Sequence, residues 1–189
     1  MSTTVCATCD ARGAKMLCGR CKSAFFCDRA CQLEGWPSHK VDCKRFVREK
    51  DDLKEKTRDA EVKANEAASQ AVESCRLEIP VDAVCYLCLC DKALVRSCAC
   101  RGTSGFAHVE CLAKLAESQE KPTPDYPDGQ RFDVWSTCQL CFQGHMGVVR
   151  LALVRRLWLD KVGCEDKSFE SSMQLLCGQA LMSFSRESC

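Results

Sequence analysis

Long apolar runs are missing from this chain of 189 residues. No stretch reaches the roughly 18 consecutive apolar residues that a membrane-spanning helix needs. The first residues, Met-Ser-Thr-Thr-Val, contain neither the basic start nor the apolar segment of a secretory signal. We therefore expect an intracellular protein without a membrane span, in a compartment that keeps thiols reduced, with cytoplasm and nucleus equally compatible.

An excess of charge of one sign is lacking too, because 27 basic and 26 acidic residues leave a formal net charge of +1. The sequence contains no candidate recognition helix with a basic face, so a nucleic-acid partner is not favoured. Histidine is scarce, at 3 residues, and none is paired with a nucleophile in a catalytic pattern. We accordingly assign no catalytic residue.

Cysteine, in contrast, is abundant, with 19 residues. In a reducing compartment, clustered cysteines indicate metal sites rather than disulfides. A Cys-x-x-Cys turn aims two sulfurs at one ion, and ligands four residues apart project from one face of a helix. The first cluster has four such pairs: Cys6, Cys9, Cys18, Cys21, Cys27, Cys31, His39 and Cys43. They supply two tetrahedral sites, and the spacing admits either a sequential or an interleaved pairing.

A second cluster again has four pairs of ligands: Cys85, Cys88, Cys98, Cys100, His108, Cys111, Cys138 and Cys141. The two clusters together provide sixteen ligands, enough for four tetrahedral Zn²⁺ ions with no ligand left over. Sites closed by four protein ligands are structural, because no position stays open for water or substrate. A minor alternative has Cys90 competing with Cys88 for the metal.

The first cluster resembles a MYND-type zinc finger, through Cys18-Gly-Arg-Cys-Lys-Ser-Ala-Phe-Phe-Cys27 and the following segment from Cys31 to Cys43. The resemblance implies an interleaved pairing, with Cys6, Cys9, Cys27 and Cys31 on one zinc and Cys18, Cys21, His39 and Cys43 on the other. It also implies that Gln32 and Trp36 line a shallow groove for short proline-containing peptides, which suit an aromatic wall. The alternative is that Trp36 only packs beneath the finger.

The run from Cys98 to Leu112 resembles the RING-CH (RINGv) variant of the RING finger, with the PHD finger as the main rival. This resemblance implies one zinc on Cys85, Cys88, His108 and Cys111, and another on Cys98, Cys100, Cys138 and Cys141. It further implies that Leu87 contacts a ubiquitin-conjugating enzyme. Two positions depart from the pattern: Leu115 stands where Trp is usual, and Phe142 where active RING fingers often place Arg or Lys.

The segments around the two clusters are expected to be largely helical. Residues 44–78 are charged, rich in Ala, Glu and Lys, and free of Gly and Pro, which predicts a solvated spacer helix on the order of 50 Å long. A coiled-coil dimer is the less favoured alternative, because the positions complementary to the apolar heptad repeat are polar. The stretch between Cys111 and Cys138 is expected to be a long loop containing an insertion.

Two further helices are expected after the second cluster. The apolar segment 148–160 predicts a helix packed on the second finger, and residues 169–184 carry one apolar helical face. This tail is either complete in itself or a truncated array of helical repeats.

These patterns predict a small α+β fold organised by zinc, with two treble- or cross-brace-type fingers joined by a charged helix. The expected domains are a MYND-type finger at 1–44, a helical linker at 45–80, a RING-CH-like finger at 81–147 and a helical tail at 148–189. The function that we expect is a protein–protein interaction adaptor whose partners include proline-containing peptides. The alternative is a RING-type ubiquitin ligase that engages a conjugating enzyme through the second finger.

Overall fold

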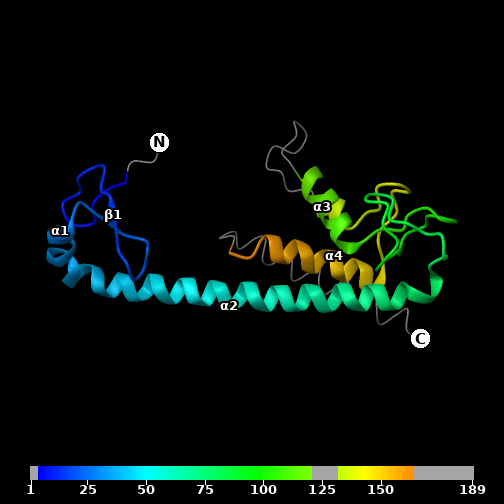
Figure 1. The fold of residues 1–189 in the computed structure, drawn as a ribbon, viewed down its shortest axis with the longest axis horizontal. Helices are drawn as coiled ribbons and strands as arrows, with labels where there is room; N and C mark the ends of the chain where they lie inside the picture. The colour runs from blue at the N-terminus through cyan, green and yellow to red at the C-terminus, as the bar shows by residue number, and fades with distance from the viewer. Residues whose placement is uncertain (1–3, 121–131, 164–189) are drawn as a thin grey trace. The chain divides into compact units, whose positions relative to one another are not determined.

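A computed structural model describes residues 4–120 and 132–163 of the chain, which divides into two compact units, residues 1–56 and 57–189. Figure 1 labels helices α1 to α4 and strand β1. Helix α2, Trp36–Cys75, contributes its first turns to the first unit and its last turns to the second. No helix within the described ranges is long and apolar enough to cross a membrane.

The first unit contains very little regular structure apart from α2. Strands β1 (Met16–Leu17) and β2 (Phe25–Phe26) pair antiparallel, and the short helix α1 covers Arg29–Glu34. Asp28 caps α1 by accepting a hydrogen bond from the Cys31 backbone N–H at 2.9 Å. The buried core of this unit is Cys6, Ala14, Cys18, Cys21, Phe26 and Cys43. Because four of these six side chains are cysteines, apolar burial alone gives this unit little stability.

Helix α2 begins at Trp36 and has Pro37 in its first turn, where a missing backbone N–H costs no hydrogen bond. It ends at Cys75 and is followed by the 3-10 turn η1, Arg76–Glu78. Ile79 is extended, with φ −86° and ψ 117°, as the residue before a proline usually is. The predicted long helix is therefore confirmed.

The expectation that this helix is solvated is wrong for its C-terminal half. One face of that half is buried at Ala60, Ala64, Ala67, Ala71 and Cys75. These positions follow the 3.6-residue helical period and form a stripe of small side chains. Ala67, Ala71 and Cys75 of this stripe belong to the main core of the second unit. The apolar heptad repeat of this segment, Phe46, Leu53, Ala60 and Ala67, includes two residues of the stripe. It does not by itself indicate burial, because Ala is also common in solvated helices.

The second unit has two core clusters. In one, the end of α2 packs with α3 (Val109–Gln119) and α4 (Gly147–Asp160), and in the other η2 (Phe132–Trp135) packs with α3 and α4. Its main core joins Ala67 and Ala71 of α2 to Phe106 and to Val149 and Ala152 of α4. The predicted helix at 148–160 is therefore confirmed, and it packs in the same core as Cys85. The 169–184 segment lies outside the described residues.

The expectation of a loop between Cys111 and Cys138 is wrong for the first part of this stretch, which belongs to helix α3. The helix is amphipathic, with Val109, Leu112, Ala113 and Ala116 buried at helical spacing. The same apolar spacing is present in the sequence, N-terminal to the prolines that favour a loop later in the segment. Because α3 begins directly after His108, it fixes the position of that side chain and of Cys111.

Candidate metal centres

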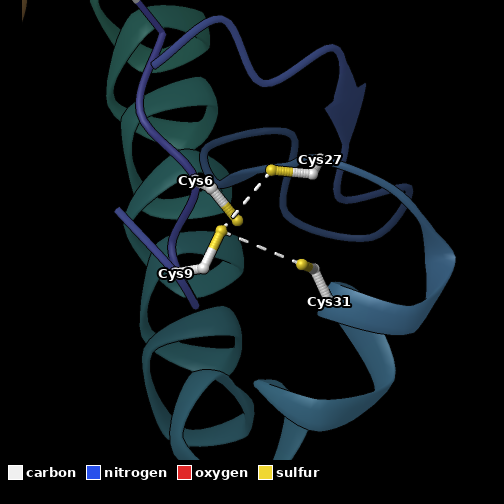
Figure 2. A group of neighbouring side chains, drawn as sticks. All are labelled: Cys6, Cys9, Cys27 and Cys31. Carbon is white, nitrogen blue, oxygen red and sulfur yellow. Dashed lines mark hydrogen bonds between the residues drawn. The ribbon is translucent and has the colours of Figure 1, made fainter. Parts of the chain in front are cut away.

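Four thiols from three places in the chain converge in the first unit: Cys6, Cys9, Cys27 and Cys31. Figure 2 shows their side chains pointing toward one another. Cys6 and Cys9 lie on one turn, Cys27 follows β2, and Cys31 lies on α1. The Cys9 sulfur is 3.5 Å from that of Cys27 and 3.9 Å from that of Cys31.

Gly35, the residue between α1 and α2, lets the Cys6–Cys9 turn approach α1. A Cβ at this position would lie 2.1 Å from Oγ1 of Thr8, which itself donates a hydrogen bond to the Cys31 carbonyl at 2.8 Å. A side chain at Gly35 would therefore push the turn that carries Cys9 away from the helix that carries Cys31. The sequence patterns pointed to neither Gly35 nor Thr8, because their role depends on a contact between distant segments.

A second group, Cys18, Cys21, His39 and Cys43, is buried throughout. Cys18 and Cys21 lie on the turn between β1 and β2, while His39 and Cys43 are one turn apart on α2. The Cys18 and Cys43 sulfurs are 3.9 Å apart, and the Cys21 sulfur is 3.6 Å from Nε2 of His39.

The third group, in the second unit, is Cys85, Cys88, His108 and Cys111. Nδ1 of His108 lies 3.2 Å from the Cys88 sulfur and 3.5 Å from the Cys111 sulfur. Nε2 of the same ring is 2.6 Å from the Lys92 carbonyl, which can only accept. Nε2 therefore carries the proton, and the Nδ1 lone pair faces the sulfurs. A metal-bound histidine is usually oriented by such a bond from its other ring nitrogen.

The fourth group is Cys98, Cys100, Cys138 and Cys141, with the Cys100 and Cys138 sulfurs 3.9 Å apart. The loop after Cys100 closes tightly over it at Gly105, which has φ +80°. A Cβ on Gly105 would lie 2.5 Å from the Cys100 Cβ and 2.9 Å from its sulfur. Arg96, which the sequence patterns did not single out, holds this loop by donating to the carbonyls of Gly102 and Ser104.

The spacings in all four groups fit a tetrahedral zinc ion. Zn–S bonds of about 2.3 Å and Zn–N bonds of about 2.0 Å at tetrahedral angles place two sulfurs about 3.8 Å apart, and sulfur and nitrogen about 3.5 Å apart. Neighbouring sulfurs within the groups lie 3.5 to 3.9 Å apart, and neighbouring sulfur and nitrogen atoms 3.2 to 3.6 Å apart. Within each group all ligand atoms lie within 4.8 Å of one another.

The electrostatics of the groups also favour a bound cation. Hydrogen bonding from the Cys9 backbone lowers the pKa of the Cys6 thiol to about 6, whereas the Cys9 side chain raises the pKa of Cys27 to about 12. In the second unit, the Gln143 backbone lowers the pKa of Cys141 to about 7, and burial raises the pKa of Cys111 to about 12. Without a metal, one thiolate suppresses ionisation of its neighbours, so full ionisation needs a cation among the sulfurs.

Several cysteine and histidine side chains of the described ranges stand apart from these groups. Cys75 is buried in the core of the second unit, 3.5 Å from the Arg96 carbonyl. Cys90 is exposed, and its sulfur lies 3.7 Å from the Cys88 carbonyl rather than in the Cys85 group. His145 is buried, with Nδ1 3.4 Å from the Ser97 hydroxyl, and burial lowers its pKa to about 4.

The three predicted contact residues are at least partly accessible. Gln32 lies on α1 and Trp36 at the start of α2, and both are half-buried. The Trp36 ring meets the His39 ring edge-on, with centroids 5.9 Å apart. Leu87 lies on the Cys85–Cys88 turn and is 39% exposed. Trp36 therefore packs against His39, a member of the second group, and also offers surface to solvent.

Comparison with known proteins identifies the first finger. The family model "MYND finger" matches residues 6–43, and this segment is a MYND zinc finger. The chain is 60% identical over 30 residues to N-lysine methyltransferase SMYD2 of Rattus norvegicus, covering 16% of this chain and 7% of that protein. It is 53% identical over 38 residues to the Zinc finger MYND domain-containing protein 10 homolog of Drosophila melanogaster, covering 20% and 8%.

A third relative, Histone-lysine N-methyltransferase SMYD1 of Homo sapiens, is 47% identical over 45 residues, which is 23% of this chain and 9% of that protein. The matches thus span less than a tenth of each of these relatives. No solved structure matches the chain. The finger, the Cys and His groups and the long helix together define a small zinc-binding protein with few strands among its described residues.

Proposed function

We propose that this protein is an interaction adaptor built on four structural zinc ions, two in each unit. The observation that carries the proposal is the grouping of Cys and His side chains into four closed sets of four ligands within the described ranges. Four protein ligands leave no coordination position for water or substrate, so the ions would fold the units rather than catalyse a reaction. The ligands of each ion would be the four members of one group.

The first binding surface in this proposal is the Gln32 and Trp36 pair of the MYND finger, and MYND fingers are protein–protein interaction modules. Trp36 has a rigid ring that packs against the His39 ring and is only half-buried, so little entropy is lost when its exposed part receives a peptide. An aromatic wall of this kind suits an extended, proline-containing segment. A short peptide of that chemistry is the ligand that we propose.

A substitution of the ring tests this surface. Trp36→Ala should retain zinc but lose capture of peptides from a proline-rich library, because the aromatic wall is gone. Val41→Ala is a matched control, since Val41 is 73% exposed on the same helix. Unchanged peptide capture by zinc-loaded Trp36→Ala protein would reject the peptide site.

A second candidate, a RING-type ubiquitin ligase, is favoured by one feature of the second finger. Leu87 is 39%, Leu140 48% and Phe142 74% exposed on its two Cys-x-x-Cys turns, so apolar contact surface is available beside the metal groups. In this candidate, the surface would hold a charged conjugating enzyme, and no nucleophile from this chain would be required. Phe142 occupies the position where active RING fingers often carry a basic residue, which favours the adaptor.

The assay that separates the two functions is discharge of ubiquitin from a panel of charged conjugating enzymes. The full chain should be used, because the second unit includes the end of α2. Acceleration that Leu87→Ala abolishes would establish a ligase. An absence of acceleration by the zinc-loaded chain supports the adaptor.

A further inference from the structure

Lys50 contacts the second metal group from outside the segment that the MYND family model matches. It lies on α2, and its Nζ donates hydrogen bonds to the carbonyls of Cys21, at 2.6 Å, and Lys22, at 3.2 Å. Both carbonyls belong to the turn that follows Cys18. A single ammonium group thus ties α2 to the turn that presents two of the four ligands of this group.

The rest of the α2 face explains how Lys50 reaches the turn. His39 and Cys43 are ligand candidates on this helix, and Phe46 and Val47 pack against the core that contains Cys18 and Cys21. Lys50 is the next residue on the same face, one turn beyond Phe46. From its N-terminal end onward, this face of α2 therefore contacts the finger through the ligand candidates, then through the apolar side chains, and finally through Lys50.

The turn from Cys18 to Lys22 has a backbone conformation that the hydrogen bonds from Lys50 would stabilise. Lys22 has φ +51°, a left-handed conformation that a non-glycine residue adopts at a cost, and its N–H donates to the Cys18 carbonyl at 2.9 Å. Its own carbonyl and that of Cys21 point outward to Lys50. With three thiolates and one imidazole around Zn²⁺, the group would carry a net charge of about −1, which a nearby ammonium group offsets.

We propose that Lys50 is a positioning residue for the zinc site formed by Cys18, Cys21, His39 and Cys43, holding the ligand turn closed and slowing loss of the ion. This inference rests on the zinc assignment of the proposed function. It extends the functional finger past Cys43 to Lys50. Partners around a metal site typically change metal affinity by 10- to 100-fold, and an exposed lysine should act at the lower end of that range.

The test compares three variants of the full chain. Lys50→Met removes the charge and the donors at similar length, Lys50→Arg keeps both, and Lys54→Met is the control one turn further on, where the ammonium instead meets Asp51 at 3.2 Å. Zinc transfer to a chromophoric chelator is followed in time, and the cysteines that become alkylated are mapped by mass spectrometry. Lys50→Met should release one ion about tenfold faster, with Cys18 and Cys21 alkylated first. Lys50→Arg should stay within about twofold of wild type, and Lys54→Met should not differ from it.

The outcomes separate positioning from general stability. Equal release rates in Lys50→Met and wild type would overturn the proposal, as would a Lys50→Arg protein that loses zinc as fast as Lys50→Met. Faster alkylation of Cys9 and Cys31 to the same extent would indicate general unfolding of the finger and would overturn it as well. A wild-type chain without zinc at residues 6–43 would instead reject the proposed function, on which this assignment depends.

Discussion

The buried stripe on α2 allows a sharp test of where the second unit begins. Ala71 is 0% exposed and belongs to the same core as Leu94, Val95 and Phe106. In Ala71→Leu, three additional carbons must be accommodated in a packed interior. Such overpacking costs about 1–3 kcal/mol of unfolding free energy. For a unit of this size, we expect the unfolding midpoint to fall by about 4–12 °C.

The assay is thermal unfolding of the zinc-loaded full chain, with hydrogen exchange to locate the change. The matched control is Gln70→Leu, which adds the same side chain to an exposed neighbouring position on α2 and should stay within about 0.5 kcal/mol of wild type. In Ala71→Leu, amide protection should fall in residues 57–163 while residues 4–56 keep theirs. If both variants unfold like wild type, the end of α2 is solvated and our description of the second core is wrong.

Two further predictions concern the second unit. Gly105→Ala should release zinc from the fourth group, because φ +80° strains any side chain and the new Cβ would lie 2.5 Å from the Cys100 Cβ. Chelator titration measures the release, and zinc retention equal to wild type would contradict this packing. Burial lowers the pKa of His145 from 6.5 to about 4, so the unfolded chain binds this proton more readily than the folded chain. The contribution of His145 to stability is therefore fully present above pH 6.5 and is lost as the pH falls toward 4. Between pH 7.5 and 5, wild type should lose about 2 kcal/mol more unfolding free energy than His145→Asn, and parallel pH profiles would refute the effect.

The sequence carries the positions of the metal groups unusually well, for a physical reason. Tetrahedral coordination holds the ligands a few ångströms apart. Ligands on one tight turn, or one turn apart on a helix, therefore recur at fixed short spacings in the sequence. Spacing left the pairing open between sequential and interleaved, and the interleaved choice came from the family resemblance. The structure brings together Cys6, Cys9, Cys27 and Cys31, which matches that choice for the first group.

The features that the sequence did not reveal depend on contacts between distant segments. Ala71 is buried only because the second core lies against it, and a solvated helix could carry the same residue. Lys50 and Arg96 resemble any other charged residue in the sequence, because the carbonyls that accept their hydrogen bonds belong to other segments. Gly35 is required only because the Thr8 side chain lies where a Cβ at this position would be. Local patterns record neither the partner nor the distance in any of these cases.

The most direct test of the account is the number of zinc ions that the folded chain binds. Native mass spectrometry of the full chain, purified under reducing conditions with zinc present, should show four ions, and elemental analysis should give the same ratio. Alkylation of the native protein should spare the cysteines of the four groups and modify exposed Cys90. A chain that binds only two ions, with the Cys and His ligand candidates of the second unit open to alkylation, would contradict the account.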